Sequence, residues 1–382
     1  MLSSSLAVRT RPMILTVNSG STSVKLAAFS STGNGEPQRV AQEHCAGGQI
    51  DARTALRAFT ARLAGAPLRA SAHRVVHGGG EFSAPTVLDA RVEARIAAFS
   101  QMAPLHNPVA LKWIDAAREV CGAGARHVAV FDTAFFAALP PLATQYAVAR
   151  DLASAHGVRR YGFHGMAHQA MWQRWCALRP RLAQGGRLIT LQLGGGCSIA
   201  AIREGRPLDT SMGFSPLEGL VMATRCGDID AAVVPYLGAR LALTAQQVID
   251  RLESASGLLG LSGCSGDMRV LLRDTSPPAQ FAIDLYCERA RKFIGAYLVV
   301  LGGCDGIVFG GGVGEHAPEI RARILQGMEW LGIALDRQAN ARALDPEISL
   351  SASGSAVDIR VVAVDEERAL AAAAVSALNE PR

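Results

Sequence analysis

One pattern occurs twice in this chain and constrains its fold more than any other feature: a buried strand, a turn of small residues and a second strand. The two copies are "ILTVNSGSTSVKLAAF" (14–29) and "LITLQLGGGCSIAAIREG" (188–205). A third glycine loop, "GIVFGGGVGEH" (306–316), also follows a strand but opens toward a helix. Short glycine loops recur by chance, so the repeat alone only suggests a duplicated fold with phosphate-binding turns.

These turns suit phosphate because small side chains let backbone N–H groups approach an anion. In the first turn, Ser21, Thr22 and Ser23 add hydroxyl donors. Lys25 adds a mobile positive charge in a chain that is otherwise poor in lysine. Neither turn matches the P-loop pattern, and a plain β-turn is the alternative for any one of them.

The bulk composition indicates a globular protein of two ordinary domains. The chain has 382 residues, of which 49% are hydrophobic and 19% charged, with a net charge of +5. We expect no nucleic-acid partner, because no basic run is interleaved with aromatic residues, and no membrane span. Eight cysteines without a C-x-x-C pair indicate reduced, mostly buried thiols and a cytoplasmic protein. Residues 1–12 are expected to be a disordered leader, and Met13 is an alternative start.

Strand-like segments alternate with helical patterns, which is typical of an α/β protein. The predicted strands are 13–18, 24–29, 72–77, 127–132, 187–193, 198–203 and 305–310. The predicted helices are 51–64, 107–121, 166–178, 245–254, 279–302 and 366–378. Asp365 is expected to cap the last of these helices.

Several ionisable residues stand at the ends of predicted strands or in irregular segments. In "AHRVVHGGGEF" (72–82), Arg74 and Val76 share one strand face, which suits a small carboxylate or phosphate with an apolar tail. A structural ion pair of Arg74 is an equally good reading of that stretch. Asp132 follows a strand, a common place for working carboxylates. Arg225 lies in the long turn-rich run 209–230, where a functional arginine is more common than on a helix face.

His164 and His168 stand four residues apart, which is the spacing of a helical metal pair. No acid follows His164, so the zinc-protease pattern fails and a core or loop histidine remains the alternative.

Together these stretches resemble the acetate kinase (acetokinase) family over nearly the whole chain after Met13. The matching motifs are "VNSGSTSVK", "HRVVHGG", "APLHNP", "FDTAF", "YGFHG", "DTSMGFSPLEGL", "TRCGDID", "GLLGLSG", "DMR", "GVGE" and "DEE". The resemblance implies two duplicated ribonuclease-H-like domains of the actin, hexokinase and heat-shock ATPase superfamily. It also implies a homodimer that transfers a phosphoryl group reversibly from ATP to acetate with Mg²⁺, for which Mn²⁺ can substitute. We expect the N-terminal domain at 13–150, with a C-terminal helix (368–382) packing back on it, and the nucleotide-binding domain at 151–367.

The resemblance also implies roles for individual residues. It makes Asp132, His164 and Arg225 catalytic, and it places Asn18 and Glu366 at the metal. It assigns the acyl substrate to Arg74, Val76, Leu105, His106, Phe163 and Pro216. It assigns the nucleotide to Lys25, Gln192, Leu193, Gly194, Gly195, Gly196, Asp267, Met268, Arg269, Gly312, Val313, Gly314, Glu315 and His316.

A carboxylate substrate is already ionised at neutral pH and needs no base. The site must instead supply alignment and positive charge around the phosphoryl group. We therefore expect Arg74, His164 and Arg225 to converge on that group, and Asp132 to orient an arginine or a metal-bound water.

The chain departs from the family mainly on the nucleotide side. "QLGGG" (192–196) stands where the family has H-L-G-N-G, and Phe136 replaces a histidine. Asp365 and His316 each replace an asparagine. These changes leave open a donor other than ATP, such as pyrophosphate, and an extra charge near the metal at Asp365. Propionate or another short acid is the alternative substrate, because one methylene discriminates by only about 1–3 kcal/mol. A weakly active paralogue that senses nucleotide or acyl phosphate is the alternative from another class.

Overall fold

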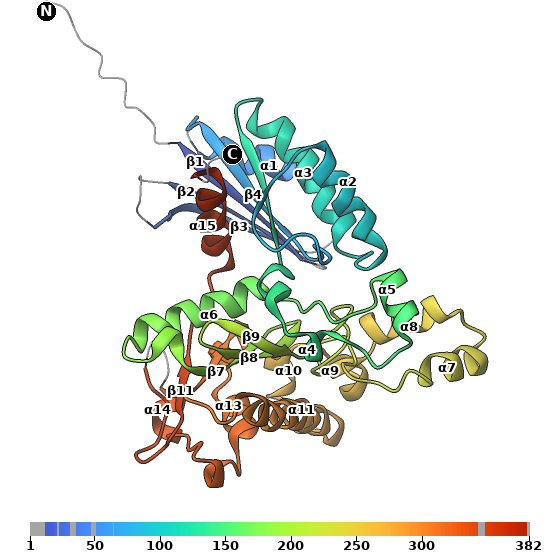
Figure 1. Ribbon diagram of the computed structural model, residues 1–382, viewed down its shortest axis with the longest axis vertical. Coiled ribbons are helices and arrows are strands. Elements are labelled where there is room, and N and C mark those ends of the chain that lie inside the picture. Colours follow the sequence, from blue (N-terminus) through green and yellow to red (C-terminus); the bar gives the residue numbers. More distant parts are fainter. Residues whose placement is uncertain are drawn as a thin grey trace, which may run out of the picture. The chain divides into compact units, whose positions relative to one another are not determined.

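The computed structural model describes residues 12–20, 23–30, 36–46, 51–63, 65–342 and 348–379. The predicted leader, apart from Pro12, and two hydroxyl donors of the first turn, Ser21 and Thr22, lie outside these residues. The chain divides into two compact units (Figure 1). Unit 1 comprises Met1–Ala134 and Asp365–Arg382, and unit 2 comprises Phe135–Val364.

The division falls before residue 150 because the residues after Ala134 pack on the core of unit 2. Phe136 and Leu139 belong to the same apolar cluster as Met171, Trp175 and Val308. Helix α15 (Glu366–Asn379) belongs to unit 1, where it packs against strands β1 and β4.

Unit 1 contains one six-stranded sheet in the order β3-β2-β1-β4-β6-β5. Its strands are β1 (Met13–Ser19), β2 (Ser23–Ser30), β3 (Gln38–Ala46), β4 (Leu68–Val75), β5 (Thr86–Val87) and β6 (Arg126–Phe131). The first three strands are antiparallel, whereas β4 runs parallel to β1 and β6 runs parallel to β4. The carboxyl ends of β1, β4 and β6 therefore meet at one edge of the sheet.

Three further helices complete unit 1: α1 (Ala52–Ala61), α2 (Ala90–Ala98) and α3 (Asn107–Cys121). Leu15 and Val17 of β1 pack with Phe59 of α1 and Trp113 of α3, all of which are buried. This apolar layer fixes β1, so that the polar residues at the end of the strand have a rigid support.

Unit 2 repeats the same sheet plan. Its strands are β7 (Arg187–Leu193), β8 (Cys197–Arg203), β9 (Arg206–Thr210), β10 (Gly306–Gly310) and β11 (Asp358–Val361). Their order is β11-β10-β7-β8-β9, with β7, β8 and β9 antiparallel and β10 and β11 parallel to β7. In both units a three-stranded meander is followed by two parallel strands on the far side of the first strand. The predicted α/β fold with duplicated ribonuclease-H-like domains is thereby confirmed.

Unit 2 also contains many helices. They are α4 (Pro141–Thr144), α5 (Arg150–His156), α6 (Gly165–Leu178), α7 (Val233–Leu241), α8 (Ala245–Ser254), α9 (Gly257–Ser262), α10 (Met268–Leu271), α11 (Pro277–Leu301), α12 (Gly311–His316), α13 (Pro318–Leu325) and α14 (Arg337–Ala341). Of these, α6, α11 and α12 pack against its sheet. Short 3-10 turns lie at Phe99–Gln101, Ala134–Ala138, Ala183–Gly185 and Glu329–Leu331.

Every strand and helix predicted from the sequence is present, with ends displaced by a few residues at most. The edge strands β3, β5, β9 and β11 and the short helices were not predicted. β5, β9 and β11 have only two to five residues, and β3 alternates exposed with half-buried residues, so none of them has a strong apolar pattern. No helix in the described part of the chain is long and apolar enough to cross a membrane.

All eight cysteines are free, as the absence of paired spacing predicted. The expectation that they are mostly buried is wrong. Cys197, Cys287 and Cys304 are buried and Cys264 is exposed, whereas the other four are half-buried.

Candidate active site

Arg74 and Asp132 form a bidentate ion pair at the carboxyl edge of the unit 1 sheet. Arg74 is the penultimate residue of β4, and Asp132 follows the neighbouring strand β6. The Nε of Arg74 donates to both carboxylate oxygens of Asp132 at 3.0 and 3.1 Å, and Nη2 donates to Oδ2 at 2.7 Å. Asp132 is 1% exposed, so this pair is largely removed from water.

Asn18, the sixth residue of β1, joins Arg74 to two carboxylates of α15. Its Oδ1 accepts from Nη1 of Arg74 at 3.1 Å. Its Nδ2 donates to Glu366 at 2.8 Å and to Glu367 at 2.9 Å. Arg74 Nη1 also lies 3.8 Å from Glu366 Oε2. The predicted residues Asn18, Arg74, Asp132 and Glu366 therefore lie together in unit 1.

Opposite charges control the ionisation of this cluster. Burial alone would lower the pKa of Arg74, but the charges of Asp132 and Glu366 outweigh it and raise that pKa. Burial would raise the pKa of Glu366, yet Arg74, the Asn18 amide and Lys25 hold it below its usual value. These opposite charges therefore favour the charged forms of both Arg74 and Glu366.

The positive groups at the rim of the cluster contact the second acid of α15. Lys25 lies opposite Asn18 in the β1–β2 pairing, and its Nζ is 3.8 Å from Glu367. Arg39 of β3 forms ion pairs with Glu367 and Asp365. Asp365 also accepts from the backbone N–H of Arg368 at 2.9 Å, which confirms it as the cap of α15.

The residues predicted to line the acyl substrate differ in burial and unit. In unit 1, Val76 is 5% exposed and Leu105 is 52% exposed. His106 is the N-cap residue of α3, beside Asn107, whose side chain bonds both the backbone N–H and the carbonyl of His77. Phe163 and Pro216 are buried residues of unit 2.

In unit 2, His164 and Arg225 come together beside the bare backbone of Gly196. A Cβ placed on Gly196 would lie 3.2 Å from Cε1 and Nε2 of His164 and 3.6 Å from Nη1 of Arg225. His164 has a φ of 59°, a left-handed conformation that costs a non-glycine residue about 1–2 kcal/mol. Such strain concentrates at functional positions. Arg225 donates from Nη1 to the carbonyl of Pro216 at 3.0 Å, which fixes its guanidinium.

The predicted nucleotide residues form two groups near the ends of β7 and β10, plus one separate pair. Gly195 accepts from the backbone of Ala223, so the loop 192–196 is tied to the segment that carries Arg225. A Cβ on Gly311 would lie 3.0 Å from Nε2 of Gln192, which places Gln192 against the start of α12. The carboxylate of Glu315 accepts from the backbone N–H groups of Gly311 and Val364 and thereby holds α12 in place. The separate pair is Asp267 with Arg269, whose guanidinium donates to both carboxylate oxygens, the shortest bond being 2.6 Å from Nη2 to Oδ2. Asp267 is also the N-cap of α10.

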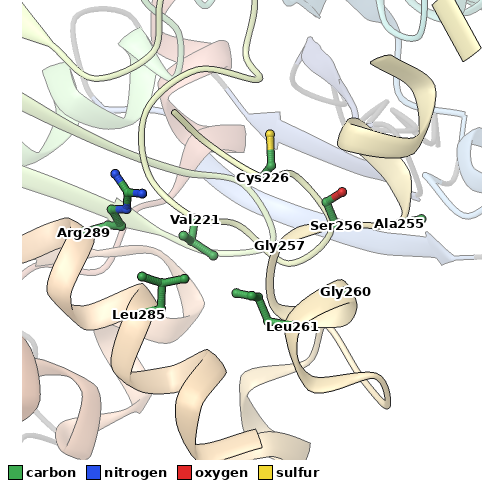
Figure 2. Close-up of a pocket in the computed structure, with 9 residues that line it drawn as sticks. All are labelled: Val221, Cys226, Ala255, Ser256, Gly257, Gly260, Leu261, Leu285 and Arg289. Atoms are coloured by element: carbon green, nitrogen blue, oxygen red, sulfur yellow. The ribbon is translucent and has the colours of Figure 1, made fainter. Parts of the chain in front are cut away.

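A pocket of about 320 Å³ lies between the segment that carries Val221 and Cys226 and helices α9 and α11 (Figure 2). It is lined by Val221, Cys226, Ala255, Ser256, Gly257, Gly260, Leu261, Leu285 and Arg289. None of the residues predicted for substrate, metal or nucleotide lines it. The pocket is therefore separate from both clusters described above.

Sequence reasoning missed two polar residues that contact the predicted ones. Glu367 accepts from Asn18, and Ser198 bonds Nδ1 of His164 at 2.9 Å. Ser198 stands two residues after the glycine loop, and that spacing was the only signal available for it. Phe136, at a position where the family has histidine, is 1% exposed and packs edge-on to His168 with ring centres 5.6 Å apart.

Comparisons with known proteins fit this arrangement. The acetokinase family model matches residues 51–372. The chain is 42% identical to the acetate kinase of Clavibacter sepedonicus, over 96% of this chain and 99% of that protein. Among solved structures it is similar to the acetate kinase of Porphyromonas gingivalis, with a TM-score of 0.84, 33% identity and coverage of 96% and 100%. It is equally similar to a propionate kinase of Francisella tularensis, with a TM-score of 0.84, 31% identity and coverage of 95% and 98%. With its duplicated sheets and charged strand ends, the chain belongs to the acetokinase family of phosphotransferases that use a carboxyl group as acceptor.

Proposed function

We propose that this protein is an acetate kinase, which transfers the γ-phosphoryl group of ATP to acetate and reverses the reaction readily. Family membership and relatives of that name support the reaction. The observation that carries the proposal is the buried Arg74, held by Asp132 and Asn18 at the carboxyl edge of the sheet. A fixed guanidinium at such an edge is suited to bind a carboxylate in one orientation.

Asp132 orients Arg74 in this mechanism and removes no proton. Its oxygens accept three hydrogen bonds from the guanidinium, so Asp132 is already committed to Arg74. Acetate needs no base because it is ionised at neutral pH. Alignment of the carboxylate with the phosphoryl group then provides most of the catalysis.

His164 and Arg225 stabilise the phosphoryl group as charge spreads over its equatorial oxygens. Both reach the surface of unit 2 at Gly196, where no side chain intervenes. An arginine and an imidazole donor at the transferring group are the kind of preorganised donors that accelerate phosphoryl transfer.

Magnesium fits the oxygen ligands of unit 1. No group of three or more acidic, histidine or cysteine side chains in the described ranges has the geometry of a metal site. Mg²⁺ with a nucleotide, however, needs only one or two carboxylates besides the phosphates. We infer that the ionised Glu366 and the Asn18 amide oxygen, which accepts from Arg74 in this structure, would hold the ion. When bound there, the ion would neutralise the negative charge of the phosphates, and Mn²⁺ can replace it.

The direct test is a hydroxamate assay of the purified full chain with ATP, Mg²⁺ and acetate, propionate or butyrate. We expect acetyl phosphate formation, with propionate as the second substrate because an added methylene costs only about 1–3 kcal/mol. The same assay with pyrophosphate tests the altered loop at Gln192. Nucleotide binding without turnover on any acid would refute the kinase and favour a sensor of nucleotide or acyl phosphate.

We also infer a cytoplasmic homodimer. The eight cysteines are all free, which fits a reducing compartment. Helix α7 buries none of its residues in this chain, although it carries Tyr236 and Leu241, which are 59% and 49% exposed. α7 packs on α8 but leaves these large apolar side chains exposed, and an exposed apolar patch is typical of a subunit interface. Light scattering should give twice the chain mass, and Tyr236→Glu should give monomers.

A further inference from the structure

A chain of four hydrogen-bonded side chains crosses the core of unit 2 and ends at His164. Nδ1 of His164 lies 2.9 Å from the Ser198 hydroxyl, and that hydroxyl lies 2.7 Å from Nε2 of His168. On its other side, Nδ1 of His168 lies 2.7 Å from the Thr190 hydroxyl. Ser198, His168 and Thr190 are 0% exposed, so water cannot replace any of these bonds.

Burial keeps the middle histidine neutral. His168 lies among apolar neighbours that include Phe136, and burial lowers its pKa to about 3. A neutral imidazole carries one ring N–H and one bare nitrogen. His168 therefore donates in one direction along the chain and accepts from the other.

Thr190 decides which direction this is. Within the described residues, the hydroxyl of Thr190 has no hydrogen-bond partner other than Nδ1 of His168. A buried hydroxyl whose proton has no acceptor destabilises the folded state by about 1–3 kcal/mol. The Thr190 proton therefore goes to Nδ1 of His168, which leaves the His168 proton on Nε2, directed at Ser198.

The remaining bond then has one arrangement. Ser198 accepts from His168 and donates its own proton to Nδ1 of His164. In this arrangement Ser198 and His168 each donate once and accept once, and Thr190 donates its proton, so each buried O–H and N–H of these three side chains has an acceptor.

We propose that Thr190, His168 and Ser198 are positioning residues that hold His164 as the neutral tautomer with its proton on Nε2. This inference rests on the proposed function, in which His164 donates to the transferring phosphoryl group. Nε2 is the atom that faces the bare Gly196 backbone and the guanidinium of Arg225. With Arg225 supplying the positive charge, a neutral donor adds a hydrogen bond without a second like charge beside it.

The tautomer can be measured without any turnover. Nitrogen NMR of the full chain labelled with ¹⁵N-histidine, at about pH 8, separates protonated from bare ring nitrogens because histidine is then above its ordinary pKa. His164→Gln identifies the His164 signals. We expect Nε2 protonated and Nδ1 bare in the wild type, and signals averaged between both tautomers in Ser198→Ala. A proton on Nδ1 in the wild type, or an unchanged spectrum in Ser198→Ala, would overturn the proposal.

Kinetics give the second readout. Loss of the Ser198 bond should lower kcat about tenfold and leave KM for acetate and ATP within about twofold. Ser198→Thr, which keeps the hydroxyl, should recover most of kcat. Thr210→Val is the matched control, because among the described residues its buried hydroxyl bonds only the carbonyl of Ile199, at 3.3 Å, and its loss should not affect kcat.

A second pair of variants covers the case in which Ser198→Ala does not fold. His168→Gln keeps a donor toward Ser198 and an acceptor toward Thr190, whereas His168→Met keeps neither. We expect the His164 tautomer to persist in His168→Gln and to be lost in His168→Met. Equal spectra of the two variants would overturn the proposed relay, by which we mean the hydrogen-bonded series Thr190, His168, Ser198 and His164. If the wild type shows the tautomer but no turnover, the proposed function fails and the relay stands.

Discussion

Asp132→Asn tests whether the carboxylate acts by holding Arg74. The shortest bond of the pair is 2.7 Å, and the two side chains are 2% and 13% exposed. At about 4 Å between charge centres and an effective dielectric constant of about 20, the attraction is about 4 kcal/mol. Asparagine keeps the shape but removes this charge. Glu366 remains 3.8 Å from the guanidinium, so we expect a net loss of about 2–3 kcal/mol.

The loss should be visible in both stability and rate. Urea unfolding should show the free energy of unfolding reduced by about 2–3 kcal/mol. If alignment of Arg74 is what Asp132 supplies, kcat/KM for acetate should fall about 30- to 150-fold, since about 1.4 kcal/mol equals a factor of ten.

Asp358→Asn is the control for stability alone. Asp358 accepts from Arg179 and Arg360 at 2.8 Å with 8% of its side chain exposed, and it lies in the other unit. This variant should lose comparable stability and keep wild-type kcat/KM well below its melting temperature. A folded Asp132→Asn enzyme with kcat/KM within about threefold of wild type would refute the need for the charge.

Three further predictions follow from the geometry. Gly196→Ala places a methyl group 3.2 Å from Nε2 of His164, so kcat should fall at least about tenfold with little change in melting temperature; an unchanged kcat would contradict the placement of His164 at the reaction. Burial lowers the pKa of His73 and of His168 to about 3, so the unfolded state binds more protons than the folded state between about pH 6.5 and 3. The free energy of unfolding must therefore fall with acid, by about 2 kcal/mol for each histidine from pH 7 to 5. Urea unfolding at the two pH values measures this loss, and His168→Gln should reduce it. Asp365→Asn should leave the Mg²⁺ dependence of activity unchanged, because that carboxylate is occupied by an arginine of β3; a shifted metal titration would show that it affects the ion.

Local patterns in the sequence predicted the fold, whereas the family resemblance assigned Asn18, Arg74, Asp132 and Glu366 to the site. Apolar runs define the central strands, and parallel strands bring their carboxyl ends together. Arg74 and Asp132 could therefore be expected at one edge before any coordinates. Their bidentate contact confirms the ion-pair reading of Arg74, and its binding of a substrate stays a prediction.

The relay of unit 2 could not be predicted, because it depends on strand register. Thr190 and Ser198 lie on adjacent antiparallel strands, and only the pairing of Gln192 with Ser198 fixes their separation. The sequence offered His168 as half of a metal pair with His164 or as a core or loop histidine, and neither reading included a hydroxyl partner. Helical spacing placed the two imidazoles near each other, but the hydroxyl between them comes from a distant part of the sequence.

The ends of β1 and β7 occupy equivalent places in the duplicated fold, but charged groups surround the first and neutral polar groups bond at the second. At the end of β1, Asn18 bonds only charged groups, namely Arg74, Glu366 and Glu367. At the equivalent end of β7, Gln192 pairs with Ser198, whose hydroxyl bonds two imidazoles, one of them held neutral by burial. A half with fixed charges suits an ionised substrate and a cation, whereas a half with a neutral relay can present a donor without altering the local charge. The same topology can therefore serve one reaction with two kinds of chemistry, because the strand ends fix the positions and the buried partners determine the charge.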